Sequence, residues 1–259
     1  MNNDIKIPKI IHQIWIGPNK MPTIWMDTFS KDYMKKCPGW QYKLWTEKEI
    51  NKLNLINRDI YDNETSYPGK ADIARYEILY QFGGVYVDAD SVWINNKCIN
   101  DLLVKANKTG FFAANEPNTK QLIANGIIGS VKNHPELLKF IKELKSRYYK
   151  MKYSVYNFFF KYDPYQITGP LYFTEFWKDK NITIFPSIYF YPTHWNNNTD
   201  INYHKKIKLP KESYMFQYGY TTSNLKDKIE EFNTNNYNHI IFLIIIIIVC
   251  IWFLVFSAN

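Results

Sequence analysis

One stretch, "KADIARYEILYQFGGVYVDAD" at residues 70–90, limits the folds open to this chain more than any other. Its first part predicts a helix from about 69 to 82 that ends at Gly83, because glycine easily adopts the conformation found beyond helix ends. The apolar run that follows predicts a strand, and this strand runs into two acidic residues, Asp88 and Asp90. A helix followed directly by a buried strand is the unit from which α/β domains are built.

The rest of the chain also alternates strands with helices. Thr46 and Glu49 have the spacing of a capping box and predict a helix start, and Pro135 lies in the first turn of another expected helix. Further strands are expected within 8–17, 39–45 and 181–192. We therefore expect an α/β fold with a mainly parallel sheet, whose ligands bind beyond the carboxyl ends of the strands.

The two carboxylates lie at such a strand end. If the strand continues past Val87, Asp88 and Asp90 share one side at strand spacing. Carboxylates this close repel each other, and a divalent cation relieves the repulsion; Mg²⁺ or Mn²⁺ typically uses one or two carboxylates together with substrate phosphates. The pair alone is a weak signal, because an acidic strand end at the protein surface has the same sequence.

A second acidic residue and an arginine precede the strand on the expected helix. Asp72 and Arg75 are three residues apart and so lie on one helix face. One interpretation is an exposed ion pair whose aspartate favours the helix dipole. The other is a pair that hydrogen-bonds the hydroxyls of a sugar beside a metal ion.

The stretch resembles the signature of family 32 glycosyltransferases and their relatives, the fungal mannosyltransferases and the clostridial glucosylating toxins, which reads D-x-x-R-(Y)-x-x-L-x-x-x-G-G-x-Y-x-D-x-D. The matching positions are Asp72, Arg75, Tyr76, Leu79, Gly83, Gly84, Tyr86, Asp88 and Asp90. Other segments that resemble the family are "IPKIIHQIWIG", "GWQYKLWTE", "NGIIGSVKNHPELLKF" and "TGPLYFTEFW". The resemblance extends from residue 7 to about residue 195.

The resemblance implies a GT-A fold, a nucleotide-sugar donor, a Mn²⁺ or Mg²⁺ ion and retention of the anomeric configuration. Carried over by position, it implies that Asp90 binds the metal directly and that Asp88 contacts the donor ribose or a metal-bound water. It implies that Asp72 and Arg75 hold the donor sugar and that Trp15 stacks on the base. No covalent nucleophile is assigned.

One departure from the family concerns the metal site. Many members have a His-rich segment that ends in Ser-Trp near the C-terminus and completes this site, whereas the corresponding stretch here is "SYMFQYGYTTS" at 213–223. Gln217 stands where a histidine is expected, and its amide oxygen could ligate a hard cation instead. Asn125 resembles part of a turn near the transferred sugar, and we expect His12 to be structural.

Two other functions remain open at this point. A phosphatase of the haloacid-dehalogenase type would use Asp88 as its nucleophile, but it also needs a later lysine and a second acidic pair, and no GDxxxD follows Asp90. A membrane-tethered protein that binds a sugar nucleotide and is catalytically weak or dead would keep the fold. Gln217 favours this alternative, and the four residues Asp72, Arg75, Asp88 and Asp90 argue against it.

The C-terminal part predicts attachment to a membrane. Residues 240–256, "IIFLIIIIIVCIWFLVF", are 17 consecutive apolar residues, which as a helix span about 25 Å and just cross a bilayer core. We expect a glycosyltransferase domain at 1–232, a polar linker at 233–239 and a single-pass anchor at 240–256, with a buried core segment as the alternative. The simplest topology is post-translational insertion into a host endomembrane with the domain in the cytosol, although the flanking charges indicate its side only weakly.

The formal net charge of +8 and the three cysteines constrain the function less than the motifs do. The densest basic stretch, at 204–211, has no interleaved aromatic residue, so we expect no nucleic-acid partner. An aromatic and basic stretch at 153–162 could face a bilayer and admit a glycolipid acceptor, or could simply cover the core. Three widely spaced cysteines predict no disulfide framework but leave a single Cys37–Cys98 bridge open.

Overall fold

A mixed six-stranded sheet forms the centre of the structure, a computed structural model that describes residues 6–18, 21–117, 122–154, 163–194 and 202–219. In order across the sheet, the strands are β2 (Gln41–Trp45), β1 (Ile10–Ile14), β3 (Gly84–Val87), β6 (Ile123–Ser130), β5 (Phe111–Asn115) and β7 (Thr183–Phe185). Strand β1 is parallel to β2 and β3, and β5 is parallel to β7. Strand β6 runs antiparallel to both of its neighbours. The expected α/β class is confirmed.

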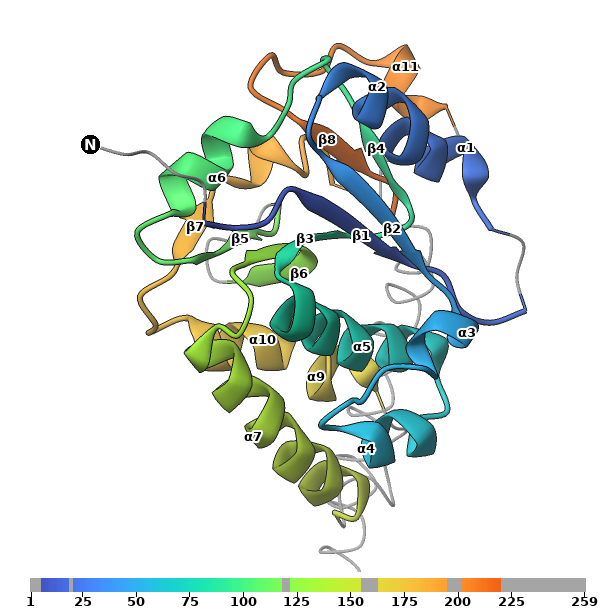
Figure 1. The fold of residues 1–259 in the computed structure, drawn as a ribbon, viewed down its shortest axis with the longest axis vertical. Helices are drawn as coiled ribbons and strands as arrows, with labels where there is room; N and C mark the ends of the chain where they lie inside the picture. The colour runs from blue at the N-terminus through green and yellow to red at the C-terminus, as the bar shows by residue number, and fades with distance from the viewer. Residues whose placement is uncertain (1–5, 19–20, 118–121, 155–162, 195–201, 220–259) are drawn as a thin grey trace, which may run out of the picture. The chain divides into compact units, whose positions relative to one another are not determined.

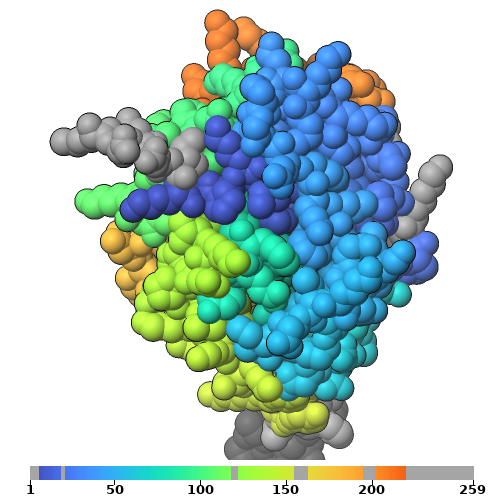
Figure 2. All heavy atoms as spheres, in the orientation of Figure 1, coloured from blue at the N-terminus to red at the C-terminus, as the bar shows by residue number. Residues whose placement is uncertain are grey.

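Helices cover both faces of this sheet (Figure 1). On one face lie α5 (Tyr67–Phe82), α7 (Pro135–Lys152), α9 (Pro164–Ile167) and α10 (Pro170–Trp177); on the other lie α6 (Asn100–Ala106) and α2 (Met34–Lys36). The remaining helices are α1 (Thr23–Asp27), the π-helix η1 (Thr28–Tyr33), α3 (Glu47–Ile50), α4 (Arg58–Asn63), the 3₁₀ helix η2 (Ser187–Tyr189) and α11 (Tyr203–Lys206). Figure 2 shows the same view with all atoms, in which blue side chains of the N-terminal segments cover much of this side.

The alternation of side chains along β3 divides the core into two layers. Val85 and Val87 pack in the layer that contains α6, whereas Tyr86 packs in the layer that contains α5 and α7. This is the alternation expected for a strand that is buried on both faces. It leaves the backbone of Asp88 at the carboxyl end of a buried strand.

Strand β3 ends at Val87, so the expectation of a strand that continues through the two carboxylates is wrong. Asp88, Ala89 and Asp90 form a tight turn, in which the N–H of Ser91 donates to the carbonyl of Asp88 at 3.1 Å. The chain then enters β4 (Ser91–Trp93), which pairs antiparallel with β8 (Met215–Gln217) in a second, two-stranded sheet. The turn still leaves both carboxylates next to one side chain, that of Gln217.

The bridge that the sequence left open is present. Cys37 follows α2, Cys98 lies in the loop after β4, and the two form a disulfide with a Cα–Cα distance of 5.7 Å. It joins positions 61 residues apart in the sequence. The bridge therefore ties the N-terminal helices to the segment that follows the two carboxylates.

The contacts of the chain divide it into Met1–Tyr218 and Gly219–Asn259. Nearly all of the described residues belong to the first unit. Among these residues, none of the helices has both the length and the apolar character needed to cross a bilayer. The expected linker at 233–239 and anchor at 240–256 lie outside the described residues, as does most of the aromatic stretch at 153–162.

Candidate active site

Asp88 and Asp90 converge on one side-chain amide. The Nε2 of Gln217 donates to Asp88 Oδ2 at 2.7 Å and lies 3.3 Å from Asp90 Oδ1. The pairing of β4 with β8 produces this contact, because it places Gln217 opposite Ser91, the residue directly after Asp90. The sequence prediction that residue 217 completes the acidic site is therefore consistent with where the fold places it.

Arg75 links the acidic turn to helix α5. Its guanidinium lies 3.0 Å from Asp72 Oδ1 and 3.3 Å from Asp88 Oδ1, and it is stacked over the ring of Tyr86 at 4.4 Å. Burial lowers the pKa of Arg75, but the neighbouring Tyr86, Asp88 and Asp72 outweigh burial and hold this pKa above its ordinary value. A permanent positive charge is thus fixed between two carboxylates, and the interpretation of Asp72 and Arg75 as an exposed surface pair is wrong.

Asp72 is buried and extensively hydrogen-bonded. Its Oδ2 accepts from the hydroxyl of Thr168 and its Oδ1 from the Nδ2 of Asn125, both at 2.9 Å. Burial raises the pKa of Asp72 to about 6, against the opposing effects of the Arg75 charge and the Thr168 hydrogen bond. Both oxygens of this carboxylate are held in place, so its position is set before any ligand arrives.

Asn125 joins the same network from strand β6. Its carbonyl accepts from Arg75 Nη1 at 2.7 Å, and its Nδ2 donates to the hydroxyl of Tyr76 at 2.9 Å. Helix α5, the end of β3 and β6 thus bring Asp72, Arg75, Asp88 and Asn125 into one cluster. That these predicted residues lie together is established by the contacts; the role of each stays a prediction.

Trp15 lies on the same edge of the sheet as the acidic turn. It follows β1 directly, and β1 runs parallel to β3, so the two strands end on one side. Its backbone N–H donates to the carbonyl of Trp45 at 3.0 Å, and its side chain is partly exposed. This placement suits the predicted stacking on a base, which stays a prediction.

His12 is structural, as its sequence context predicted. Its ring is 1% exposed, its Nε2 lies 2.8 Å from the carbonyl of Gly83, and its Nδ1 accepts from the indole of Trp45 at 3.1 Å. A carbonyl can only accept, so Nε2 carries the proton and the imidazole is neutral. The ring fixes the start of β3 and takes no part in the acidic cluster.

Sequence reasoning assigned no role to several residues that hold the turn. Gln13 donates from Nε2 to the carbonyl of Asp88 at 3.1 Å, and the hydroxyl of Tyr86 donates to Asp88 Oδ1 at 2.7 Å. Tyr86 had a usable signal, because strand alternation places it on the α5 face, where Arg75 lies. Gln13 and Thr168 lie in segments that resemble the family, but nothing in the sequence indicated these contacts, since they depend on how distant segments pack.

The donor set around the turn fits a hard divalent cation. Among the described residues no three His, Cys, Asp or Glu side chains gather into a metal-binding group, so the protein ligands at hand are the two carboxylates and, once it turns toward them, the amide oxygen of Gln217. Oxygen donors are the ligands that Mg²⁺ and Mn²⁺ prefer. The convergence of Asp88 and Asp90 on a single nitrogen shows that both carboxylates can face one small group.

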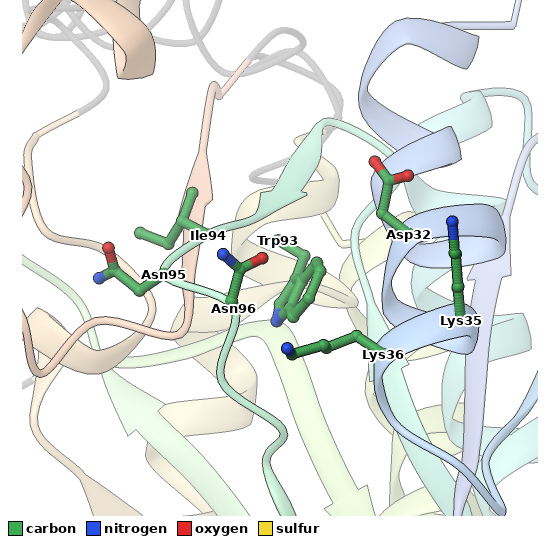
Figure 3. A pocket seen from close by; sticks show the side chains of 7 residues that line it. All are labelled: Asp32, Lys35, Lys36, Trp93, Ile94, Asn95 and Asn96. Carbon is green, nitrogen blue, oxygen red and sulfur yellow. The ribbon is translucent and has the colours of Figure 1, made fainter.

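A separate pocket of about 440 Å³ lies away from this cluster. Figure 3 shows its lining, which comes from η1, α2, the end of β4 and the loop after it. The lining residues are Asp32, Lys35, Lys36, Trp93, Ile94, Asn95 and Asn96. None of the predicted site residues belongs to it.

Comparison with known proteins places this geometry in a family. Residues 22–109 match the family described as "Glycosyltransferase sugar-binding region containing DXD motif", a range that includes Asp72, Arg75, Asp88 and Asp90. Inositol phosphoceramide mannosyltransferase 3 of Schizosaccharomyces pombe is 30% identical over 68% of this chain and 46% of its own length. Mannosyl phosphorylinositol ceramide synthase CSH1 of Saccharomyces cerevisiae is 32% identical over 66% of this chain and 43% of its own length.

The chain thus spans about half the length of the curated relatives it matches. Among solved structures, the PaToxG glycosyltransferase superposes with a TM-score of 0.48 at 19% identity, over 66% of this chain and 68% of that one. The region 22–109, matched by the family model, contains the acidic turn and the Asp72–Arg75 pair that the contacts join into one cluster. The chain belongs to the glycosyltransferase family whose sugar-binding region contains a DXD motif.

Proposed function

We propose that the protein is a metal-dependent, retaining glycosyltransferase of the GT-A type that moves a hexose from a nucleotide-sugar donor to a glycan or glycolipid acceptor. The observation that carries the proposal is the buried guanidinium of Arg75 between Asp72 and Asp88. A third carboxylate, Asp90, faces the amide of Gln217, as Asp88 does. An array of fixed charges at the end of a parallel strand suits the recognition of a diphosphate-linked sugar.

The chain's own residues divide the work between cation and sugar. Asp88, Asp90 and the amide oxygen of Gln217 would hold Mn²⁺ or Mg²⁺, which when bound neutralises the charge that develops on the leaving diphosphate. Asp72 and Asn125 present fixed polar groups beside this point for the sugar. Trp15 would stack on the base, an interaction worth about 1–3 kcal/mol per base in nucleic-acid complexes.

The relatives guide the choice of donor and acceptor. Both relatives are named for joining mannose to an inositol-phosphate ceramide. We take mannose as the first sugar to test and a glycolipid as the first acceptor. Attachment through residues 240–256, in an endomembrane, would keep the domain close to such a lipid.

The test is a screen of UDP- and GDP-sugars with Mn²⁺ that measures nucleotide release by the full chain. We expect one donor to be turned over, and Asp90→Asn to reduce turnover at least about 100-fold without unfolding the domain, because a ligand of the cation is removed. Asp62→Asn is the matched control, since the side chain of Asp62 is exposed and lies 3.6 Å from Arg58 on the same helix.

Three results separate the alternatives. Near-normal turnover by Asp90→Asn would show that the metal assignment is wrong. Binding of a nucleotide sugar without release would favour a catalytically weak or dead binding protein. If no nucleotide sugar binds and none is turned over, the proposed enzyme function fails.

A further inference from the structure

A buried tyrosine hydroxyl beside the acidic turn makes no hydrogen bond with any described residue. Tyr191 follows η2, is 3% exposed, and packs in the core layer that contains Val87 and Ile127. A buried hydroxyl without a partner lowers stability, so such groups are rare unless a ligand or function uses them.

The position of Gly126 shows where this hydroxyl points. A Cβ on Gly126 would stand 2.6 Å from Asp88 Oδ2, 3.1 Å from Gln217 Nε2 and 3.1 Å from the Tyr191 hydroxyl. The missing side chain of Gly126 thus allows these three polar groups to approach one point. Tyr191 is therefore aimed at the same place as two of the three groups expected to bind the cation.

The phenol is a hydrogen-bond donor at every physiological pH. Burial and the nearby charge of Asp88 raise the pKa of Tyr191 well above its ordinary value. Asp88 already accepts from Gln217 and from Tyr86. A neutral donor without a partner suits an oxygen that arrives with a ligand.

Two side chains, Asp88 and Gln217, lie near this hydroxyl and decide how a ligand would reach it. The side chain of Asp88 is 23% exposed, so the site is open on that side. The amide of Gln217 donates to both carboxylates, and an N–H donor cannot stay between them when they bind a cation. Loading the site with a cation requires this amide to turn, and the amide and the Tyr191 hydroxyl each lie 3.1 Å from the Cβ position of Gly126, so the turn changes the surroundings of this hydroxyl.

We propose that Tyr191 is a donor-binding residue, whose hydroxyl donates to an oxygen of the bound nucleotide sugar, either a phosphate oxygen or a hydroxyl of the transferred hexose. The inference rests on the proposed function, and it adds a contact from outside the matched region 22–109. Because the hydroxyl gains its first partner when the donor binds, its contribution appears in binding and not in folding.

The test compares Tyr191→Phe with wild type by calorimetric titration of the full chain. The ligands are Mn²⁺ alone, a nucleoside diphosphate with Mn²⁺, and the nucleotide sugar with Mn²⁺. We expect Tyr191→Phe to lower the affinity for the ligand that the hydroxyl contacts about tenfold, as for loss of a hydrogen bond to a charged or well-ordered group. The affinity for Mn²⁺ alone should be unchanged. If the variant binds both the nucleoside diphosphate and the nucleotide sugar more weakly, the contact is to phosphate. If it binds only the nucleotide sugar more weakly, the contact is to the hexose.

Thermal unfolding of the free proteins gives a second readout. Tyr191→Phe should melt at the same temperature as wild type or higher, since it removes a buried group that has no partner. Tyr149→Phe is the control: its hydroxyl donates to Asp59 at 2.7 Å, away from the site, so this variant should lose stability and bind normally.

Unchanged binding by Tyr191→Phe, a lowered melting temperature, or equal weakening of Mn²⁺ alone would overturn the inference. In each case the wild type still binds its donor and the proposed function stands. If the wild type binds no nucleotide sugar, the proposed function fails and the inference fails with it.

Discussion

His12 shows how a single residue can make the stability of this domain depend on pH. Burial lowers the pKa of its imidazole from 6.5 to about 4, and nearby Lys43 acts in the same direction, against the hydrogen bond to Gly83. The unfolded chain therefore binds a proton before the folded one does. The contribution that neutral, buried His12 makes to the free energy of unfolding is fully present above pH 6.5. It is lost as the pH falls toward 4, by up to about 3 kcal/mol.

Urea unfolding of the wild type and His12→Asn, at pH 7 and at pH 4.5, tests this expectation. The variant has no group that titrates at this position, so its free energy of unfolding should fall less between the two values than that of the wild type. Comparing the change within each protein removes the loss of packing that the substitution itself causes. Equal losses in both proteins would mean that His12 is not the group responsible.

At the scale of elements, the link between α5 and β3 depends on Gly84, for which Gly39, before β2, is the control. Gly84 has φ +100°, and a Cβ there would meet His12 Nε2 and the carbonyl of Ile10, each at 2.8 Å. Gly39 has φ +81° but nothing within 4 Å of the same point. Gly39→Ala should therefore cost about 1–2 kcal/mol from backbone conformation alone, and Gly84→Ala about 2 kcal/mol more from crowding.

Chemical denaturation of both variants measures that difference. Gly84→Ala should also weaken donor binding, because β3 carries Asp88 at its end, whereas Gly39→Ala should not. Similar stabilities for the two variants would show that the neighbours of Gly84 move aside at little cost.

The elements show how far the sequence could predict this structure. Local signals were sufficient where they depend on neighbours in the chain: the capping box of Thr46 and Glu49 forms, and the predicted helix at 69–82 is α5. The antiparallel insertion of β6 and the pairing of β4 with β8 depend on contacts between distant segments and had no local signal. Gln217 was predicted by resemblance, and Tyr191 was not, because its role depends on the tertiary position of Gly126.

At the scale of the whole molecule, the disulfide bears on the compartment in which the domain folds. Disulfides persist in oxidising compartments and are rare in the cytosol. The Cys37–Cys98 bridge thus favours a domain on the lumenal or outer side of a membrane over the cytosolic placement that the sequence suggested. Because the bridge closes a loop of about 60 residues, its loss should lower the free energy of unfolding by about 2–4 kcal/mol.

Thiol trapping in cells that express the full chain tests both parts of this argument. In chains denatured with detergent, only Cys250 of the three cysteines should react with an alkylating mass tag before reduction, and all three should react afterwards. Cys37→Ala should expose Cys98 to the tag and lower stability, whereas Cys250→Ala should leave the bridge and the stability unchanged. If all three cysteines react without reduction, the bridge does not form in the cell, and the cytosolic placement is restored.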